Sequence, residues 1–125
     1  MSILVVEDDE FIRLMLAEAL TDEGYRVLIA ENGRVALDLL HQHGQPPALI
    51  LLDLMMPVMS GWEFCAELDR DPALAGIPVV VLSAMPQPAV QASGLRVEAV
   101  VAKPIDLDQL LALAARFDRP PGGET

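Results

Sequence analysis

The stretch Ile3-Leu4-Val5-Val6-Glu7-Asp8-Asp9 decides the fold, because an apolar run rich in β-branched residues leads directly into three acids. A continuous apolar run is typical of a strand that is covered on both faces, as in a parallel sheet. The next stretch, Asp9–Glu23, carries apolar side chains at helical spacing, and Gly24 ends that pattern. The beginning of the chain therefore predicts a buried strand, an acidic turn and an amphipathic helix.

The same alternation of short apolar runs and longer amphipathic stretches continues along the chain. Further strands are expected at Arg26–Ala30, Ala48–Leu52, Pro78–Leu82 and Ala99–Ala102, and further helices at Gly33–His43, Ser60–Arg70, Pro88–Ser93 and Leu107–Phe117. Five strands alternating with five helices predict a flavodoxin-like, doubly wound α/β sandwich, with a five-stranded parallel sheet in the order 2-1-3-4-5. One domain is expected over residues 1–118, followed by a disordered tail at residues 119–125.

Composition limits the kinds of partner that the sequence predicts. The chain has 125 residues, 53% of them hydrophobic, and a formal net charge of −11 with eight Lys and Arg residues. Nucleic acid and anionic membranes both attract Lys and Arg, so the acidic balance predicts neither a nucleic-acid nor a membrane partner. The N-terminus lacks a basic leader, and no apolar run approaches the roughly 20 residues of a membrane span, which predicts a cytoplasmic protein.

Polar residues follow four of the five predicted strands. Glu7 and Asp8 come after the first strand, Asp53 after the third, Ser83 after the fourth and Lys103 after the fifth. Ligands of doubly wound sheets bind beyond the carboxyl ends of the strands, so these side chains are expected to meet there. Carboxylates gathered in one place raise one another's pKa values unless a cation intervenes. Mg²⁺ takes one or two carboxylates and leaves room for a phosphate, so the grouping predicts a site for phosphoryl chemistry.

The roles at this site follow from charge. A carboxylate can attack phosphorus and form an aspartyl phosphate, and Asp53 on a central strand is the best candidate nucleophile. Lys103 can neutralise a phosphoryl oxygen, and the Ser83 hydroxyl can donate a hydrogen bond to another. The ordinary interpretation of Asp9 is an N-cap that stabilises the first helix. An isolated Asp before a turn is also usually a cap, and it is the coincidence at four strand ends that favours a functional site.

With these residues in place, the chain resembles the receiver domain of bacterial two-component response regulators. The resemblance covers residues 2–117 and rests on Ile3-Leu4-Val5-Val6-Glu7-Asp8, Ala30-Glu31-Asn32-Gly33, Leu51-Leu52-Asp53-Leu54-Met55-Met56-Pro57, Gly61, Pro78-Val79-Val80-Val81-Leu82-Ser83-Ala84 and Lys103-Pro104. It implies a Mg²⁺-dependent phosphorylation by a histidine kinase or phosphotransfer protein, and a conformational signal to a downstream output protein. The chain would be a phosphoacceptor switch that assists its own phosphorylation and dephosphorylation, as a monomer or weak dimer, and not an enzyme.

The resemblance also implies roles for single residues. The metal ligands would be Glu7, Asp8, Asp53 and the main-chain carbonyl of Met55, with Asp8 as the more direct member of the acidic pair and Asp9 acting at most through water. Asp53 would be the phosphoacceptor, and Ser83 and Lys103 would hold phosphoryl oxygens. Pro104 would follow a cis peptide bond, which X-Pro bonds permit at modest cost.

Two features depart from the family pattern. Val100 stands where the family usually has Tyr or Phe, and the fourth helix, with Pro86 and Pro88 at its start, is about one turn shorter than is common. The usual output face is therefore expected to be altered. The loss of the aromatic favours an alternative, a receiver-like adaptor that binds a partner without phosphorylation. An aspartyl-phosphate phosphatase would need a second acid at Met55, and a flavin carrier would need a Ser/Thr/Gly-rich loop after the first strand.

The remaining polar and aromatic residues have ordinary interpretations. Trp62 is expected to be a partly buried packing residue, with contact to a partner as the alternative. His41 and His43 are expected to be solvated at a helix end, and Cys65 to be a small apolar residue of a helix. Because nothing after Phe117 is expected to form an output module, the sequence predicts a stand-alone receiver or one excised from a longer chain.

Overall fold

The computed structural model describes residues 2–42, 44–95 and 97–117. Its elements in chain order are β1 (Ser2–Val6), α1 (Glu10–Asp22), β2 (Arg26–Ala30), α2 (Gly33–Gln42), β3 (Leu49–Asp53), α3 (Gly61–Arg70), β4 (Val79–Ser83), α4 (Gln87–Ala92), β5 (Ala99–Ala102) and α5 (Leu107–Phe117). The strands form one parallel sheet in the order β2-β1-β3-β4-β5, which confirms the predicted fold. The predicted tail at residues 119–125 lies outside the described residues.

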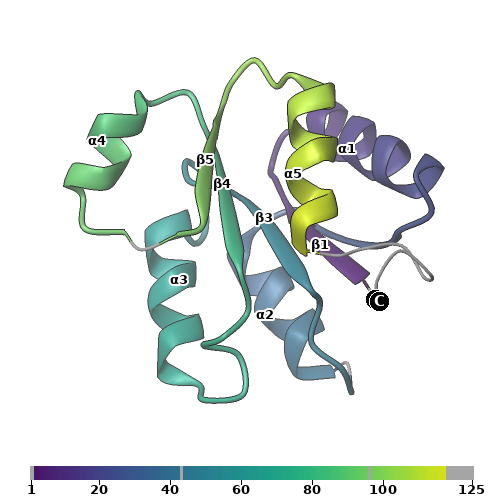
Figure 1. Ribbon diagram of the computed structural model, residues 1–125. Helices are drawn as coiled ribbons and strands as arrows, with labels where there is room; N and C mark the ends of the chain where they lie inside the picture. The colour runs from purple at the N-terminus through teal and green to yellow at the C-terminus, as the bar shows by residue number, and fades with distance from the viewer. Residues whose placement is uncertain (1, 43, 96, 118–125) are drawn as a thin grey trace.

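Helices cover both faces of the sheet (Figure 1). Along β1, Ile3 and Val5 face the layer formed by α1 and α5, while Leu4 and Val6 face α2, α3 and α4. Successive side chains of a strand point to opposite faces, so a strand covered on both sides must be apolar throughout. The continuous apolar runs of the sequence are the result of this double coverage.

Helices α1 and α3 each begin with a side-chain cap. The Asp9 carboxylate accepts a hydrogen bond from the Ile12 main-chain N–H at 3.0 Å at the start of α1. At the start of α3, Ser60 Oγ accepts from the Glu63 N–H at 3.2 Å, and Glu63 Oε1 accepts from the Ser60 N–H at 2.8 Å. Such caps satisfy main-chain donors that have no partner within the helix. The loops that lead from β1 into α1 and from β3 into α3 are therefore fixed at the point where each enters a helix.

Helix α4 is short. It has six residues, with Pro86 as its N-cap residue and Pro88 within its first turn, where a missing N–H costs nothing. Gly94 takes a positive φ of 84° just after the helix, as a residue without a Cβ readily does. The described residues between Gly94 and β5 form no further helix, as the prolines and Gly94 predict.

Candidate functional site

The strand register brings the predicted site residues to one edge of the sheet. Val6 pairs with Leu52, so Glu7 and Asp53 follow side by side on β1 and β3. Asp53 pairs with Leu82, which places Ser83 one residue further along β4. Lys103 follows the last residue of β5, and its main-chain N–H donates to the Ser83 carbonyl at 3.0 Å.

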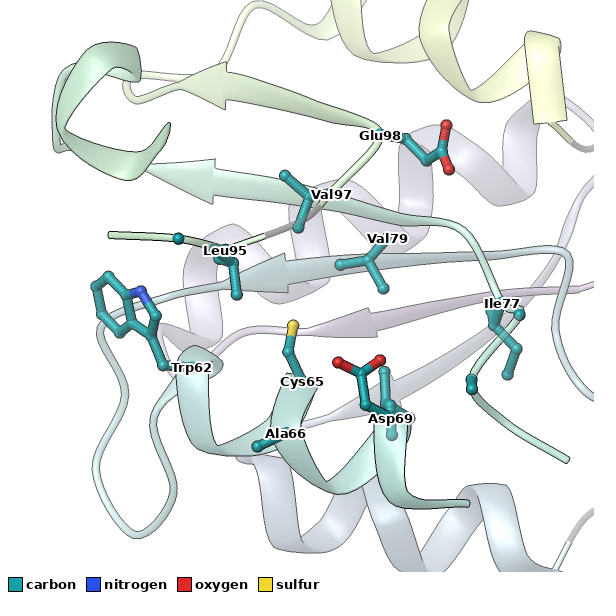
Figure 2. A pocket seen from close by; sticks show the side chains of 13 residues that line it. Trp62, Cys65, Ala66, Asp69, Ile77, Val79, Leu95, Val97 and Glu98 are labelled. Carbon is teal, nitrogen blue, oxygen red and sulfur yellow. The ribbon is translucent and has the colours of Figure 1, made fainter. Parts of the chain in front are cut away.

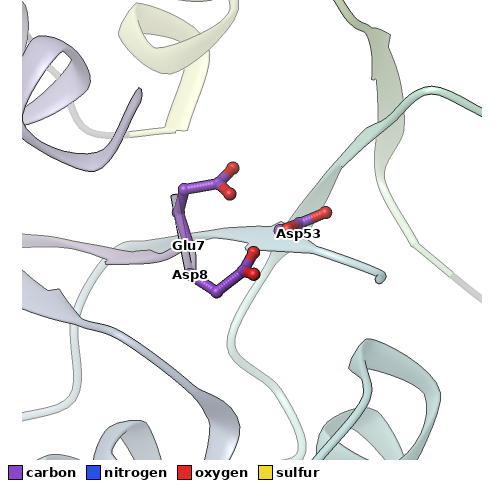
Figure 3. A group of neighbouring side chains, drawn as sticks. All are labelled: Glu7, Asp8 and Asp53. Carbon is purple, nitrogen blue, oxygen red and sulfur yellow. The ribbon is translucent and has the colours of Figure 1, made fainter. Parts of the chain in front are cut away.

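Three carboxylates form a cluster at this edge. Glu7, Asp8 and Asp53 each offer an oxygen within 4.8 Å of the others (Figure 3). Glu7 and Asp53 are buried, at 0% and 3% exposed, while Asp8 is exposed. The cluster thus has two members taken out of water and one that faces it.

Lys103 supplies positive charge to the cluster. Its Nζ lies 3.1 Å from Glu7 Oε1 and 3.4 Å from Asp53 Oδ1. Burial by itself lowers the pKa of Lys103, but the neighbouring Asp53 and Glu7 carboxylates raise it above its ordinary value. The ammonium is therefore held in its charged form between two buried acids.

The contact with Lys103 does not fully balance the negative charge of an ionised Asp53. The pKa of Asp53 is raised from 3.8 to about 7; burial is the largest cause, the nearby Asp8 and Glu7 carboxyl groups add to it, and Lys103 acts in the opposite direction. One ammonium does not offset burial and two neighbouring acids. The cluster has the electrostatics of a cation site whose protein charges are only partly balanced.

Glu7 is held through both its side chain and its main chain. Its Oε2 accepts from the Asp9 N–H at 3.1 Å, and Arg13 Nη1 donates to the Glu7 main-chain carbonyl at 3.0 Å. Among the described residues, the buried Oε1 accepts no hydrogen bond and has only the ion pair with Lys103. Arg13 was not predicted, because its reach back from α1 to the end of β1 depends on how the helix packs.

Asp9 and Met55 take different parts at this edge. The Asp9 carboxylate caps α1, as its ordinary interpretation predicts, and does not belong to the acidic cluster. The Met55 main-chain N–H donates to Asp53 Oδ1 at 3.3 Å, while its side chain is exposed. The backbone of Met55, and not its thioether, is therefore the part that lies at the site.

The loop from Asp53 to α3 is tightly folded. Val58 has a positive φ of 71°, unusual for a β-branched residue, and the Met59 N–H donates to the Pro57 carbonyl at 2.7 Å. This is the geometry of a γ-turn, a strained turn. The turn returns the chain to β3, where the Gly61 N–H donates to the Leu54 carbonyl at 2.9 Å. A Cβ on Gly61 would lie 2.7 Å from Leu54 Cα, so this close approach requires glycine.

Ser83 and Val100 lie on the two strands at the other side of Asp53. Ser83 is buried, and its Oγ accepts from the Met85 N–H at 2.9 Å, while no described residue accepts its hydroxyl hydrogen. Val100 pairs with Val81, is half-buried and packs against the core on the α2, α3 and α4 side. The Lys103–Pro104 peptide bond is cis, as the resemblance implies.

The other singled-out residues lie away from the cluster. His41 is exposed, with Nε2 3.4 Å from Asp71 Oδ2, and His43 lies outside the described residues. Cys65 is buried in α3, and burial with nearby Asp69 raises its thiol pKa to about 12. Trp62 is half-buried and donates its indole N–H to Ser93 Oγ at 2.9 Å.

In the part of the chain that the structure describes, no helix is long and apolar enough to cross a bilayer.

The chain is thus an α/β protein with a doubly wound parallel sheet that carries three acids and a lysine at its carboxyl edge. Residues 3–115 match the family described as the response regulator receiver domain, and the chain belongs to that family.

Known proteins agree with this assignment. A chemotaxis protein of Vibrio cholerae, CheY4, is 28% identical and superposes with a TM-score of 0.84 over 94% of this chain and 98% of its own. A receiver domain of a histidine kinase from Syntrophus aciditrophicus is also 28% identical, with a TM-score of 0.83 over 99% of this chain and 97% of its own. The response regulator MprA of Mycolicibacterium vanbaalenii is 38% identical over 88% of this chain and 47% of its own length.

The relatives correct one expectation. A protein of Picosynechococcus named a probable transcriptional regulatory protein is 38% identical over 88% of this chain and 46% of its own length. The exclusion of a nucleic-acid partner, drawn from the net charge of −11, is therefore wrong. The charge argument concerns only the surface of these residues, whereas this chain spans about half the length of the curated relatives that it matches.

Proposed function

We propose that this chain is a phosphorylation switch in which Asp53 accepts a phosphoryl group from a histidine kinase or phosphotransfer protein. One observation carries the proposal: Asp53 is 3% exposed, its pKa is raised to about 7, and Lys103 Nζ lies 3.4 Å from its Oδ1. A buried carboxylate beside a fixed ammonium at a sheet edge is suited to nucleophilic attack on phosphorus.

The transfer balances as a displacement at phosphorus. A carboxylate oxygen of Asp53 forms the new P–O bond while the P–N bond to the donor imidazole breaks. The electron pair of that bond returns to the imidazole nitrogen, which takes up a proton. Oδ1 already accepts the Met55 N–H and faces Lys103, so Oδ2, which has no donor among the described residues, is the attacking oxygen.

The residues present fit a Mg²⁺ ion. Three carboxylate oxygens lie within 4.8 Å of one another, and their charge is only partly balanced by Lys103. Asp8, Asp53 and the Met55 carbonyl would hold the ion. Glu7 accepts from the Asp9 N–H and pairs with Lys103, so it would act as a neighbour of the ligands and help to fix their positions. When bound, Mg²⁺ supplies positive charge that offsets the developing charge on the phosphoryl oxygens.

Lys103 and Ser83 stabilise the phosphoryl group once it is attached. The Lys103 ammonium attracts one of its oxygens, and the Ser83 hydroxyl donates its unused hydrogen to another. The same groups remain in place when water attacks the acyl phosphate, so the site also assists dephosphorylation. The phosphorylated state then signals to a protein partner by a conformational change.

Intact-protein mass spectrometry after incubation with acetyl phosphate tests this proposal. We expect one added phosphoryl group with Mg²⁺ present and none in EDTA. Asp53→Asn should stay unmodified, and Asp38→Asn, a change on the exposed face of α2, is the matched control that should still be labelled. Labelling of Asp53→Asn to the same extent as the parent would overturn the assignment.

A further inference from the structure

Two successive main-chain carbonyls just beyond β1, those of Glu7 and Asp8, accept no hydrogen bond from the main-chain N–H of any described residue. The Glu7 N–H still donates to the Ala30 carbonyl at 3.1 Å, and the sheet ends at this point. Glu7 is fully buried, so its carbonyl needs a donor other than water. The turn that carries the acids therefore depends on a side chain for its main-chain hydrogen bonds.

Arg13 supplies the donor for both carbonyls. Its Nη1 lies 3.0 Å from the Glu7 oxygen and, in a longer and weaker contact, 3.5 Å from the Asp8 oxygen. These carbonyls belong to the two peptide units on either side of the Asp8 Cα. Because a peptide unit is planar, holding both units restrains φ and ψ of the residue between them. Arg13 therefore restrains the direction in which the Asp8 side chain leaves the turn.

The arginine is itself held by α1. Its main-chain N–H donates to the Asp9 carbonyl at 2.9 Å, in the first turn of the helix that Asp9 caps. The side chain is half-buried, and in the part of the chain that the structure describes it forms no ion pair with a carboxylate. The guanidinium of Arg13 is thus directed at the main chain of the turn, although three acids lie close by.

We infer that Arg13 is a positioning residue for the cation site, which holds the Asp8 carboxylate in the acidic cluster before a metal ion binds. Asp8 is the exposed member of the cluster, whereas Glu7 and Asp53 are buried. A ligand that is already oriented loses less entropy when the ion binds. This inference rests on the Mg²⁺ site of the proposed function, and it gives Arg13 no contact with the phosphoryl group.

Charge and positioning make opposite predictions for the removal of Arg13. The guanidinium is a positive charge close to a site for a divalent cation, so Coulomb repulsion alone predicts tighter Mg²⁺ binding once that charge is gone. Loss of positioning predicts weaker binding, because residues that orient metal ligands typically contribute about tenfold or more to metal affinity. The direction of the change in Mg²⁺ affinity therefore separates the two effects.

Mg²⁺ titrations followed by amide resonances test the inference. Arg13→Met should raise the Kd for Mg²⁺ about tenfold. Arg13→Lys keeps the charge and one donor nitrogen but not the planar guanidinium, and should raise the Kd about threefold. Arg116→Met is the matched control, since Arg116 is exposed in the last turn of α5, at the end of the helix remote from Lys103. It removes the same charge and should leave the Kd within about twofold.

Trp62, the sole tryptophan, reports on the fold away from the turn. It lines a cavity of about 560 Å³ between α3 and the chain that leads from α4 into β5, on the face of the sheet opposite to α1 (Figure 2). Its indole N–H donates to Ser93 Oγ at 2.9 Å. The indole resonance should be the same in the parent and in the three arginine variants, which would show that each variant retains the fold.

Two outcomes would overturn the inference. One is Mg²⁺ binding by Arg13→Met that is as tight as that of the parent or tighter, and Arg13→Lys is judged in the same way if Arg13→Met does not fold. The other is equal weakening by Arg13→Met in the parent and in Asp8→Ala, because a residue that acts through the Asp8 carboxylate has nothing to position once that carboxylate is removed. Failure of the proposed function gives a different result, in which the parent binds Mg²⁺ but takes no phosphoryl group from acetyl phosphate.

Discussion

The Lys103 ammonium lies 3.4 Å from Asp53 Oδ1, and yet the pKa of Asp53 is raised, to about 7. Burial is the largest cause, and the adjacent Asp8 and Glu7 carboxyl groups add to it. The ion pair with Lys103 therefore does not offset the free-energy cost of ionising Asp53 in this buried, acidic site. Extra positive charge at the cluster should stabilise the folded protein, and this expectation governs the predictions on pH and metal.

Asp53→Asn should stabilise the protein in EDTA, increasingly as pH rises. A raised folded-state pKa means that the contribution of Asp53 to stability is full below pH 3.8 and is lost as pH rises through about 7. The free energy of unfolding of Asp53→Asn should therefore exceed that of the parent by on the order of 2 kcal/mol at pH 8 and by little at pH 4. Urea melts at both pH values measure this, with Asp38→Asn as control, and a difference independent of pH would contradict it.

Substitution of Asp8 and of its neighbour Asp9 should affect different properties, Mg²⁺ affinity in the first case and stability in the second. Asp8→Ala should weaken Mg²⁺ binding by at least about tenfold, because Asp8 is the exposed member of the cluster. Asp9→Ala should leave Mg²⁺ binding nearly unchanged but lower the free energy of unfolding by about 1 kcal/mol, since it removes the cap of α1. Calorimetric titration with Mg²⁺ and thermal melts separate the two effects. If Asp8→Ala binds Mg²⁺ like the parent, the ligand has been misassigned.

Gly61→Ala should be costly, while Gly76→Ala should be nearly neutral. The added methyl at position 61 would lie 2.7 Å from Leu54 Cα, whereas at position 76 it would meet nothing within 4 Å. We expect a loss of about 2 kcal/mol in the free energy of unfolding for Gly61→Ala. Denaturant melts measure both variants. Equal stabilities would show that the loop after Asp53 yields without cost.

Phosphorylation should act mainly on the loops nearest to Asp53. Val100 has no ring or hydroxyl to exchange partners, whereas Ser83 has an unused hydrogen-bond donor. Beryllofluoride with Mg²⁺ should therefore cause large amide shifts in residues 55–61 and 83–88 and small ones in residues 97–101. Shifts along β5 comparable to that of Ser83 would show that the usual output face works without its aromatic.

The sequence predicted the features that depend on local pattern. Continuous apolar strands and the acids after them located Glu7, Asp8, Asp53, Ser83 and Lys103 at one sheet edge, because strand ends are visible in the chain. The features that the sequence did not predict depend on tertiary packing. They are the hydrogen bond from Arg13 to the Glu7 carbonyl and the cavity beside α3, which exist only once the helices pack against the sheet. The net charge led to the wrong prediction that nucleic acid is not a partner. Net charge describes only the surface of these residues, and not the longer proteins in which such a domain occurs.

Chemical trapping of the modified residue tests the central claim most directly. Protein treated with acetyl phosphate and Mg²⁺ is reduced with borohydride, which converts an aspartyl phosphate into homoserine, and peptides are then sequenced by mass spectrometry. The account predicts homoserine at position 53, dependent on Mg²⁺ and reduced in yield by Lys103→Met. Homoserine at position 8 or 9 with position 53 unchanged, or no homoserine after labelling, would contradict it.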